Sequence, residues 1–314
     1  MQGVNTIAAL AAAVSRKHSV AHLGRARLGR KAGLMLAAVA AGLALSLPAH
    51  ADNPNKGKMF KVAADVGLVP FFMRGTDGKM DGFSNDLTQE VAQRMGYDGA
   101  EVIDTPFSAI FAGLFSSRYD MVAAPTNTTQ ERAQQMLFAE PYMAGGLSFL
   151  AKKGATVNSL EDLKDKTIAV NNGSFSDRWL QENQEKYGYK IQRFNKNTDA
   201  VQAVAIGRAF ANMSETPLAR YIATKTPALA PVYDMTTEAN YAFAFRKDDT
   251  ALRNRVDEVL ECMKQDGSLS KLHMKWFGTE PNAGTAMTVV FPGYGAPDFP
   301  GYEPTEHTPD CSRP

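Results

Sequence analysis

The stretch MVAAPTNTTQERAQQMLFAEPY, Met121 to Tyr142, holds the junction on which the interpretation of the whole chain depends. Its first residues, Met121 to Ala124, are an apolar run typical of a buried strand, and Pro125 is expected to end that strand. After a polar turn the pattern becomes helical, and Arg132 falls inside the first helical turn. The stretch therefore predicts a strand, a loop and a helix that begins with an arginine.

Several features of this junction favour an anion-binding role for Arg132. Thr128 and Glu131 have the spacing of a capping box, which marks the helix start. A helix N-terminus offers free N–H donors, and ligands of open α/β sheets bind at the carboxyl ends of strands. The guanidinium group adds a planar fork that matches a carboxylate. Arg132 is a candidate for holding a small carboxylate; the alternative is a surface salt bridge with Glu131 or Glu140.

A second junction of the same kind lies later in the chain. The strand-like run TIAV leads into residues 171–174, and Ser174 with Asp177 resembles the same capping box, with the shorter aspartate in place of glutamate. Strand and helix patterns alternate around both junctions, which predicts an α/β fold with mostly parallel sheets. Two such units in series, joined by extended stretches near 143–150 and 240–247, predict two lobes with two hinge crossings.

These patterns give an expected division of the chain. It consists of a leader at 1–51, a first lobe at 52–143 and 244–279, a second lobe at 144–243, and an irregular C-terminal arm at 280–314 that is rich in Pro and Gly.

The leader has the pattern of a secretory signal peptide. It contains six Lys and Arg and no acidic residue, followed by an apolar run of about 16 residues and the triplet Ala49-His50-Ala51. We expect cleavage after Ala51. The alternative is a membrane anchor, for which the run is short compared with the roughly 20 residues of a membrane span.

Charge and motif content exclude several function classes. Without the leader, 28 Lys and Arg stand against 33 Asp and Glu, a net charge of −5, which argues against a nucleic-acid partner. The 263 remaining residues contain two histidines, His273 and His307, and no HExxH, GxSxG or phosphate-loop motif. No catalytic residue, metal site or cofactor is predicted.

Cys262 and Cys311 are the two cysteines of the chain. Outside the cytosol such a pair is expected to form a disulfide, which would attach the C-terminal arm to a helix. The alternative is a buried thiol at Cys262 and a frayed terminus.

From about Lys61 to Gly278 the sequence resembles the periplasmic solute-binding proteins of polar amino-acid ABC importers, which have the bilobal type II fold. The motifs that carry the resemblance are VPFFMRGTDGKMDGFSNDL, LFSSRYDMVAAPTNTTQER, FAEPY, LEDLKDKTIAVNNGS, AIGRAFA with ETPLA, and DGSLSKLHMKWFG. The resemblance implies a ligand cleft between two α/β lobes.

It also implies roles for individual residues. Arg132 would grip the α-carboxylate of an amino acid, assisted by the amides of Gly173, Ser174 and Phe175. Glu215, where the family commonly has aspartate, would take the α-ammonium group.

A second implied set would shape the pocket for the ligand's side chain. Asp65 follows the first strand, and Leu68, Phe71 and Phe107 would form an aromatic or apolar wall. Asn127 corresponds to a position that often offers a hydroxyl to the ligand. Pro125 stands where a small Gly or Ser is usual, and it has no N–H to donate.

The expected function follows from the resemblance. The protein would be a periplasmic, monomeric binding protein that captures a small carboxylate or amino-acid ligand by hinge closure and delivers it to the membrane permease of an ABC importer. Two alternatives remain open: an enzyme on the same fold, similar to cyclohexadienyl dehydratase, and a binding protein that serves a sensor or a periplasmic enzyme system.

Overall fold

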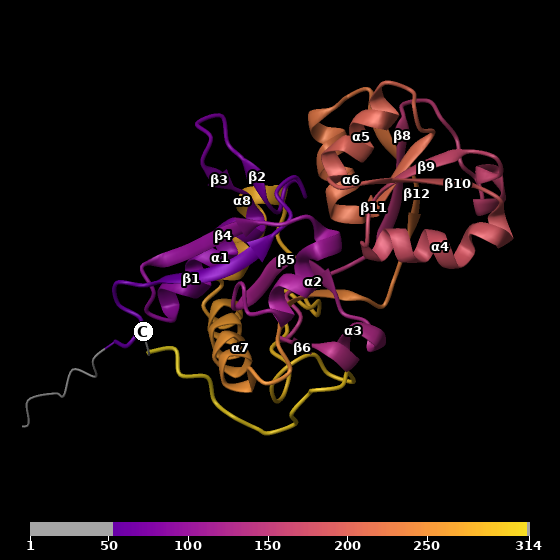
Figure 1. Ribbon diagram of the computed structural model, residues 1–314. Helices are drawn as coiled ribbons and strands as arrows, with labels where there is room; N and C mark the ends of the chain where they lie inside the picture. The colour runs from indigo at the N-terminus through magenta and orange to yellow at the C-terminus, as the bar shows by residue number, and fades with distance from the viewer. Residues whose placement is uncertain (1–52, 313–314) are drawn as a thin grey trace, which may run out of the picture. The chain divides into compact units, whose positions relative to one another are not determined.

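The computed structural model describes residues 53–312. The expected signal peptide and its cleavage site lie outside these residues. Between residues 53 and 312 no helix has the length and apolar character needed to cross a membrane. The described chain forms two lobes, each built on its own sheet, which confirms the predicted two-lobed α/β architecture (Figure 1).

The first lobe is built on a sheet with the strand order β4-β1-β5-β13-β6, and β7 also pairs with β13. Its parallel pairs, β1 with β4 and β1 with β5, carry the predicted β-α-β pattern, whereas β13 runs antiparallel to its neighbours. The elements are β1 (Met59–Ala64), β2 (Met73–Arg74), β3 (Met80–Asp81), α1 (Phe83–Arg94), β4 (Gly99–Asp104), α2 (Phe107–Phe115), β5 (Met121–Asn127), α3 (Gln130–Gln135), β6 (Leu137–Phe138), β7 (Met143–Ala144), β13 (Asn240–Phe245), α7 (Thr250–Gln265) and α8 (Ser268–Phe277).

The strand β5 does not end at Pro125, as the sequence suggests, but continues to Asn127. Its register with β13 shifts between Ala242 and Ala244, so extra residues of β5, including Pro125, bulge out of the ladder. A bulge tolerates proline because no ladder hydrogen bond is needed from the missing N–H. The strand thus carries Asn127 to the carboxyl edge of the sheet.

The second lobe is built on a sheet with the order β10-β9-β11-β8-β12. β9, β10 and β11 are parallel, β8 runs antiparallel to β11, and the edge strand β12 runs antiparallel to β8. Helices α4, α5 and α6 pack on this sheet (Figure 1). The elements are β8 (Leu147–Lys152), a 3-10 turn (Leu160–Leu163), β9 (Thr167–Asn171), α4 (Phe175–Tyr187), β10 (Lys190–Phe194), α5 (Asn197–Ala205), β11 (Ala211–Glu215), α6 (Thr216–Lys225) and β12 (Leu229–Met235).

The two crossings between the lobes are shorter than the extended stretches suggest. The first runs through Gly145 and Gly146, because β8 already belongs to the second sheet; the second precedes Asn240, because β13 pairs with β5. Residues 240–243, expected in the second lobe, therefore lie in the first sheet. The crossings touch: the Gly145 N–H donates to the Ala239 carbonyl at 3.0 Å. A Cβ at Gly145 would lie 2.5 Å from that oxygen, so only glycine fits.

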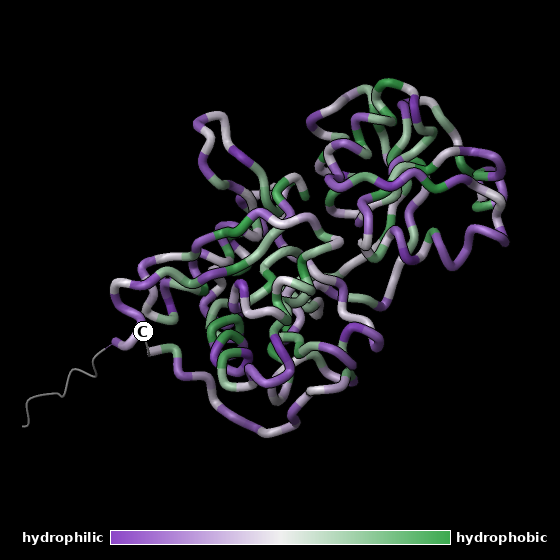
Figure 2. The backbone as a smooth tube through the Cα atoms, in the orientation of Figure 1, coloured by the Kyte–Doolittle hydropathy of each residue, from purple (hydrophilic) through white to green (hydrophobic). Residues whose placement is uncertain are grey.

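Each lobe has a core of apolar side chains between its sheet and helices. Hydrophobic segments run along the central strands of both sheets (Figure 2). Leu87 and Val91 of α1, and Met95 directly after it, are spaced four residues apart and are all buried. Removing such surfaces from water supplies the main driving force for folding each lobe.

Helix α7 is buried on its charged face as well as on its apolar face. Arg253 and Asp257 are fully buried, and both contact the C-terminal arm: Arg253 donates to Gly301 and pairs with Glu303, and Asp257 accepts from the Gly295 N–H. Further along the helix, the fully buried Lys264 side chain donates to the Val289 carbonyl. The arm thus supplies partners for charges that would otherwise be exposed to water or left unpaired.

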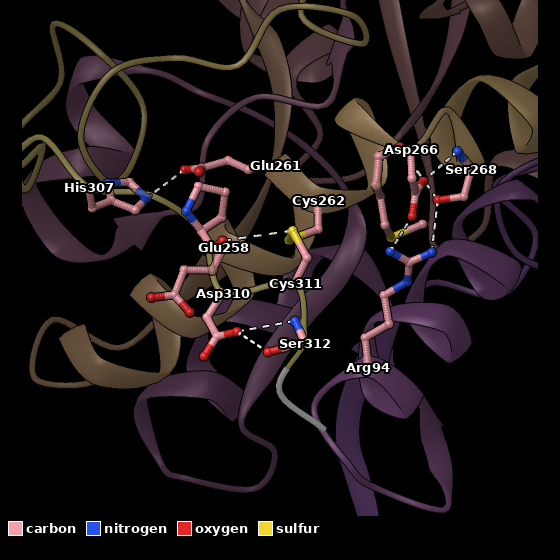
Figure 3. The surroundings of a disulfide bond; sticks show 12 residues. Arg94, Glu258, Glu261, Cys262, Asp266, Ser268, His307, Asp310, Cys311 and Ser312 are labelled. Carbon is pink, nitrogen blue, oxygen red and sulfur yellow. Dashed lines mark hydrogen bonds and ion pairs between the residues drawn. A yellow bond between two sulfur atoms is a disulfide. The ribbon is translucent and has the colours of Figure 1, made fainter.

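The predicted disulfide between Cys262 and Cys311 is present, with the two Cα atoms 5.6 Å apart. It joins α7 to the end of the arm (Figure 3). Near it, His307 of the arm lies 3.0 Å from Glu261 of α7 and stacks on Tyr294. The arm is therefore irregular in backbone, as the sequence predicts, and attached along its length.

Loss of the disulfide should measurably destabilise the protein. The bridge spans 49 residues, and closing a loop of this size is expected to stabilise a fold by about 2–4 kcal/mol. We expect a Cys262→Ser/Cys311→Ser variant to lose this amount in urea unfolding.

Cys262 is buried, so its replacement by serine also buries a hydroxyl group, whereas Cys311 is exposed. The single variant Cys311→Ser therefore measures the loss of the bridge without that second effect. An unchanged unfolding midpoint in both variants would contradict a stabilising role for the bridge.

Candidate ligand-binding site

The candidate site lies where the carboxyl ends of parallel strands from both sheets meet. β1 leads into Asp65, β4 towards Phe107, and β5 ends at Asn127; in the other lobe β9 ends at Asn171 and β11 at Glu215. This is the edge at which open α/β sheets bind ligands. The cavity between these ends is lined by Leu68, Phe107, Pro125, Asn127, Asn171, Ser174, Phe175, Ser176, Asn197, Met213, Ser214 and Glu215.

Arg132 stands at the start of α3, close to this cavity. The N-cap of α3 is Thr129, whose hydroxyl accepts from the Arg132 N–H, so the predicted cap at Thr128 is wrong by one residue. The Arg132 guanidinium donates to the Asn127 carbonyl at 3.0 Å. Its Cζ lies 5.5 Å from the centre of the Phe107 ring and 5.2 Å from that of Phe111. The two rings and the carbonyl hold the guanidinium in place by cation–π and hydrogen-bond contacts.

The two acids considered as surface partners for Arg132 are engaged elsewhere. Glu131 pairs with Arg178 of the second lobe, and Glu140 pairs with Lys264 at 2.9 Å. Arg132 therefore forms a salt bridge with neither Glu131 nor Glu140.

Arg132 and Glu215 come from opposite lobes and interact electrostatically. Burial lowers the pKa of Arg132 to about 10, and Glu215 opposes that shift. Burial raises the pKa of Glu215, while Arg132 and the Ser176 hydroxyl act in the other direction. Arg132 stays charged at neutral pH. A cation beside the cavity on one lobe and a carboxyl group that lines it on the other are therefore close enough to influence each other.

The loop before α4 contributes an N-terminal cap, as predicted. The Ser174 hydroxyl accepts from the Asp177 N–H at 3.1 Å. The Asp177 carboxylate bonds to the Gly173 N–H rather than to the Ser174 N–H, and also pairs with Arg193. The Gly173 amide is thereby occupied within the loop, whereas Ser174 and Phe175 line the cavity.

Asp65 is fully buried beside the cavity and has partners on both lobes. It accepts from the Phe107 N–H at 3.3 Å, from Asn171 Nδ2 at 2.9 Å and from Lys196 Nζ at 2.8 Å. Lys196 also donates to Asp104 at 2.6 Å. Burial lowers the pKa of Lys196, but its hydrogen bonds with the two aspartates outweigh this and leave the pKa above its usual value. Lys196 therefore carries its charge.

Several polar atoms around the cavity are available to a ligand. Apart from Ser176, whose hydroxyl interacts with Glu215, the lining residues contain four buried atoms without a hydrogen-bond partner within residues 53–312: Asn127 Oδ1, Asn171 Oδ1, Asn197 Nδ2 and Ser214 Oγ. Unsatisfied buried polar groups are costly, and they concentrate at functional sites. This cavity is built to hydrogen-bond a polar molecule.

The cavity is narrow in this arrangement of the lobes. The centre of a water molecule can move within about 10 Å³, which is room for roughly one water. A ligand of amino-acid size could therefore be accommodated only if the two walls moved apart.

The structure brings most of the expected site residues together. Asp65, Arg132 and Gly173 lie next to lining residues. Phe71 does not reach the cavity: it packs in the core of the first lobe against Phe83, Tyr241 and Phe277. The expected residues that line the cavity are Leu68, Phe107, Pro125, Asn127, Ser174, Phe175 and Glu215.

Several lining residues are absent from the sequence-based set. Asn171 ends a predicted strand, and its position at a carboxyl edge could have identified it. Met213 and Ser214 lie on β11, a short strand between two helices, where no strand is predicted above. Lys196 and Asn197 lie at the start of α5, where no local motif distinguishes them.

Within residues 53–312 no group of three or more His, Cys, Asp and Glu side chains is arranged so that it could hold a metal ion.

Two lobes joined by two crossings, with a polar cavity at their facing strand ends, define a hinged binding protein of the periplasmic type. Residues 60–279 match the family model of bacterial extracellular solute-binding proteins, family 3. The chain belongs to this family.

Individual relatives agree with this assignment. The L-cystine-binding protein TcyJ of Escherichia coli (strain K12) is 30% identical over 267 residues, covering 83% of this chain and 98% of TcyJ. The arginine-binding extracellular protein ArtP of Bacillus subtilis (strain 168) is 30% identical over 253 residues, covering 78% and 98%. The structure of an ancestral arginine-binding protein bound to arginine superposes with a TM-score of 0.67 at 30% identity, covering 71% and 99%.

These relatives are binding proteins, so the chain is a solute-binding protein and not an enzyme. The dehydratase alternative is thereby set aside.

Removing the cap of α4 should weaken the wall of the site. We expect Ser174→Ala to cost about 1 kcal/mol of stability, because the Asp177 N–H loses its acceptor in a buried position. Ser174→Gly should cost only a few tenths of a kcal/mol of stability, since glycine is a good N-cap residue. Urea unfolding of both variants measures the difference; equal losses would contradict a capping role.

Proposed function

We propose that the protein captures an amino acid between its lobes, with Arg132 holding the α-carboxylate and Glu215 the α-ammonium group. The observation that carries this proposal is the placement of a cation and a carboxyl group on opposite lobes at a single polar cavity: Arg132 contacts the lining residues Asn127 and Phe107, and Glu215 lines the cavity from the other lobe. A zwitterion satisfies both groups at once. The family and the amino-acid-binding relatives support the same assignment.

Asp65, Ser174, Phe175, Asn127, Pro125, Leu68 and Phe107 complete the proposed site. In this scheme the apolar members pack against the ligand's carbon atoms, and Asn127 Oδ1 accepts a hydrogen bond from it. The Ser174 hydroxyl is used by the cap of α4, so the loop contributes chiefly through its backbone and the Phe175 ring.

Binding and closure are coupled in this proposal. A ligand that contacts Arg132 and Glu215 together binds the closed form more tightly than the open form and shifts the population by that difference. Gly145 and Gly146, at the first crossing, and residues 236–239, at the second, are the proposed hinge.

The cellular role follows from family membership. We infer that the leader is cleaved after Ala51, that the protein acts as a monomer in the periplasm, and that it delivers its ligand to the membrane permease of an ABC importer. The acidic net charge of residues 52–314 supports a role without nucleic acid.

Arg132 can be tested by ligand-induced stabilisation. An amino acid at 100 times its dissociation constant should add about 2.7 kcal/mol to the stability of the wild type, seen as a rise in melting temperature. We expect Arg132→Ala to weaken binding by about 2–5 kcal/mol, because a buried carboxylate would lose its cation. Arg132→Lys should recover part of the loss, since it keeps the charge without the planar fork.

Arg220→Ala is the matched control, because Arg220 pairs with Asp234 on an exposed part of the second lobe. If Arg132→Ala bound amino acids as tightly as this control, the carboxylate assignment would be wrong.

Glu215 makes binding depend on pH. Its pKa is raised by burial, so in the unliganded protein the carboxyl group takes up a proton at a higher pH than an ordinary glutamate. A ligand ammonium group favours the ionised form, and affinity should therefore fall as the pH is lowered through this raised pKa. Calorimetric titrations between pH 5 and 8 measure the dissociation constant at each pH. Glu215→Gln should bind more weakly and without this dependence; an identical pH profile would refute the role of Glu215.

A further inference from the structure

We propose that Lys196 determines the ligand class of the cleft. By supplying the cation for Asp65 from the opposite lobe, it restricts the site to amino acids whose side chains are uncharged and can donate a hydrogen bond. This inference rests on the proposed amino-acid function and deepens it.

The first step is the charge state of the closed cleft. Asp65 is a fully buried carboxylate, and a buried charge requires a partner of opposite sign. Lys196 Nζ provides it at 2.8 Å. Arg132 and Glu215 are reserved for the two charges that every amino acid carries. These four groups balance around a zwitterion. Lys196 also pairs with Asp104 at 2.6 Å, but that carboxylate is 42% exposed to solvent, so no unpaired buried charge remains for the ligand's side chain.

The second step is what a third charge on the ligand would meet. A basic side chain that approached Asp65 would also approach Lys196, which already holds that carboxylate. An acidic side chain would approach a second buried carboxylate. In a low-dielectric site like charges at short distance are strongly unfavourable, so both kinds of ligand are discriminated against.

The third step concerns hydrogen bonding. Asn171 lines the cavity, and its Nδ2 donates to Asp65 at 2.9 Å. A carboxylate can only accept, so this bond determines which end of the Asn171 amide faces Asp65 and leaves Oδ1 as an acceptor. Oδ1 has no partner within residues 53–312. A carboxamide or hydroxyl on the ligand side chain could donate to it.

The fourth step separates this pair from a general lobe–lobe contact. Arg178 and Glu131 also pair across the lobes, with side chains that are 43% and 55% exposed and do not line the cavity. The Lys196–Asp65 pair involves a side chain with no exposure and adjoins the lining residues Phe107 and Asn171. The two pairs therefore provide a matched comparison between closure and specificity.

The experiment is calorimetric titration of the full chain with glutamine, glutamate and arginine. Glutamine and glutamate differ little in shape, so charge is the variable. The wild type should bind glutamine at least about tenfold more tightly than either charged ligand, a difference of about 1.4 kcal/mol.

In Lys196→Met, Asp65 loses its cation. Arginine binding should then improve relative to glutamine by at least about tenfold, while glutamate binding weakens further. Lys196→Arg keeps the charge and should retain the preference of the wild type. In Lys196→Met/Asp65→Asn both charges are absent, and the preference for glutamine over arginine should return. Melting curves of each variant verify that it is folded.

Arg178→Met removes the other interlobe pair and should weaken the binding of all three ligands by the same factor. If Lys196→Met also weakened the binding of all three by the same factor, Lys196 would only stabilise closure, and the inference would be overturned. Tighter binding of arginine than of glutamine by the wild type would overturn it too. If the wild type bound no amino acid in a broad panel, the proposed function itself would fail, and this inference with it.

Discussion

The structure of the cleft depends on one contact, the hydrogen bond from the Gly145 N–H to the Ala239 carbonyl that holds the two crossings side by side. Because the chain leaves the first lobe and returns to it at neighbouring points, β8 and β13 enter their sheets antiparallel to β11 and β5. The parallel strands of both sheets then end at the same interface. Residues of the candidate site that are far apart in the sequence meet at this interface because of the connection.

In the proposed binding mode, closure and recognition share the same chemistry. The charged groups of the cleft are divided between the lobes: Asp65 and Arg132 belong to the first, Lys196 and Glu215 to the second. Bringing the lobes together buries these charges, which is unfavourable unless each finds a partner of opposite sign. Asp65 and Lys196 partner each other within the protein. Arg132 and Glu215 are the pair that a zwitterionic ligand can separate and satisfy.

Helix α7 illustrates how tertiary structure overrides a sequence pattern. Its apolar positions recur with a helical period, and in the sequence its charged positions are typical of a solvated face. The arm covers that face, and Arg253 and Asp257 become fully buried with partners from residues 295–303. Spacing along a helix shows which residues share a face, but a second segment decides whether water or protein covers it. The disulfide at Cys262 keeps that segment in place.

The sequence by itself determined the α/β alternation, the two lobes, the disulfide and the strand–helix junctions at Arg132 and Ser174, because these features depend on local periodicity, capping chemistry and cysteine count. It did not determine where β5 ends, since a bulge accommodates Pro125, or that Phe71 lies in the core. The partnership of Asp65 with Lys196, 131 residues away, was decided by the tertiary structure alone. A charge pair across two lobes leaves no periodic trace in the chain, because only folding brings its members within hydrogen-bond distance.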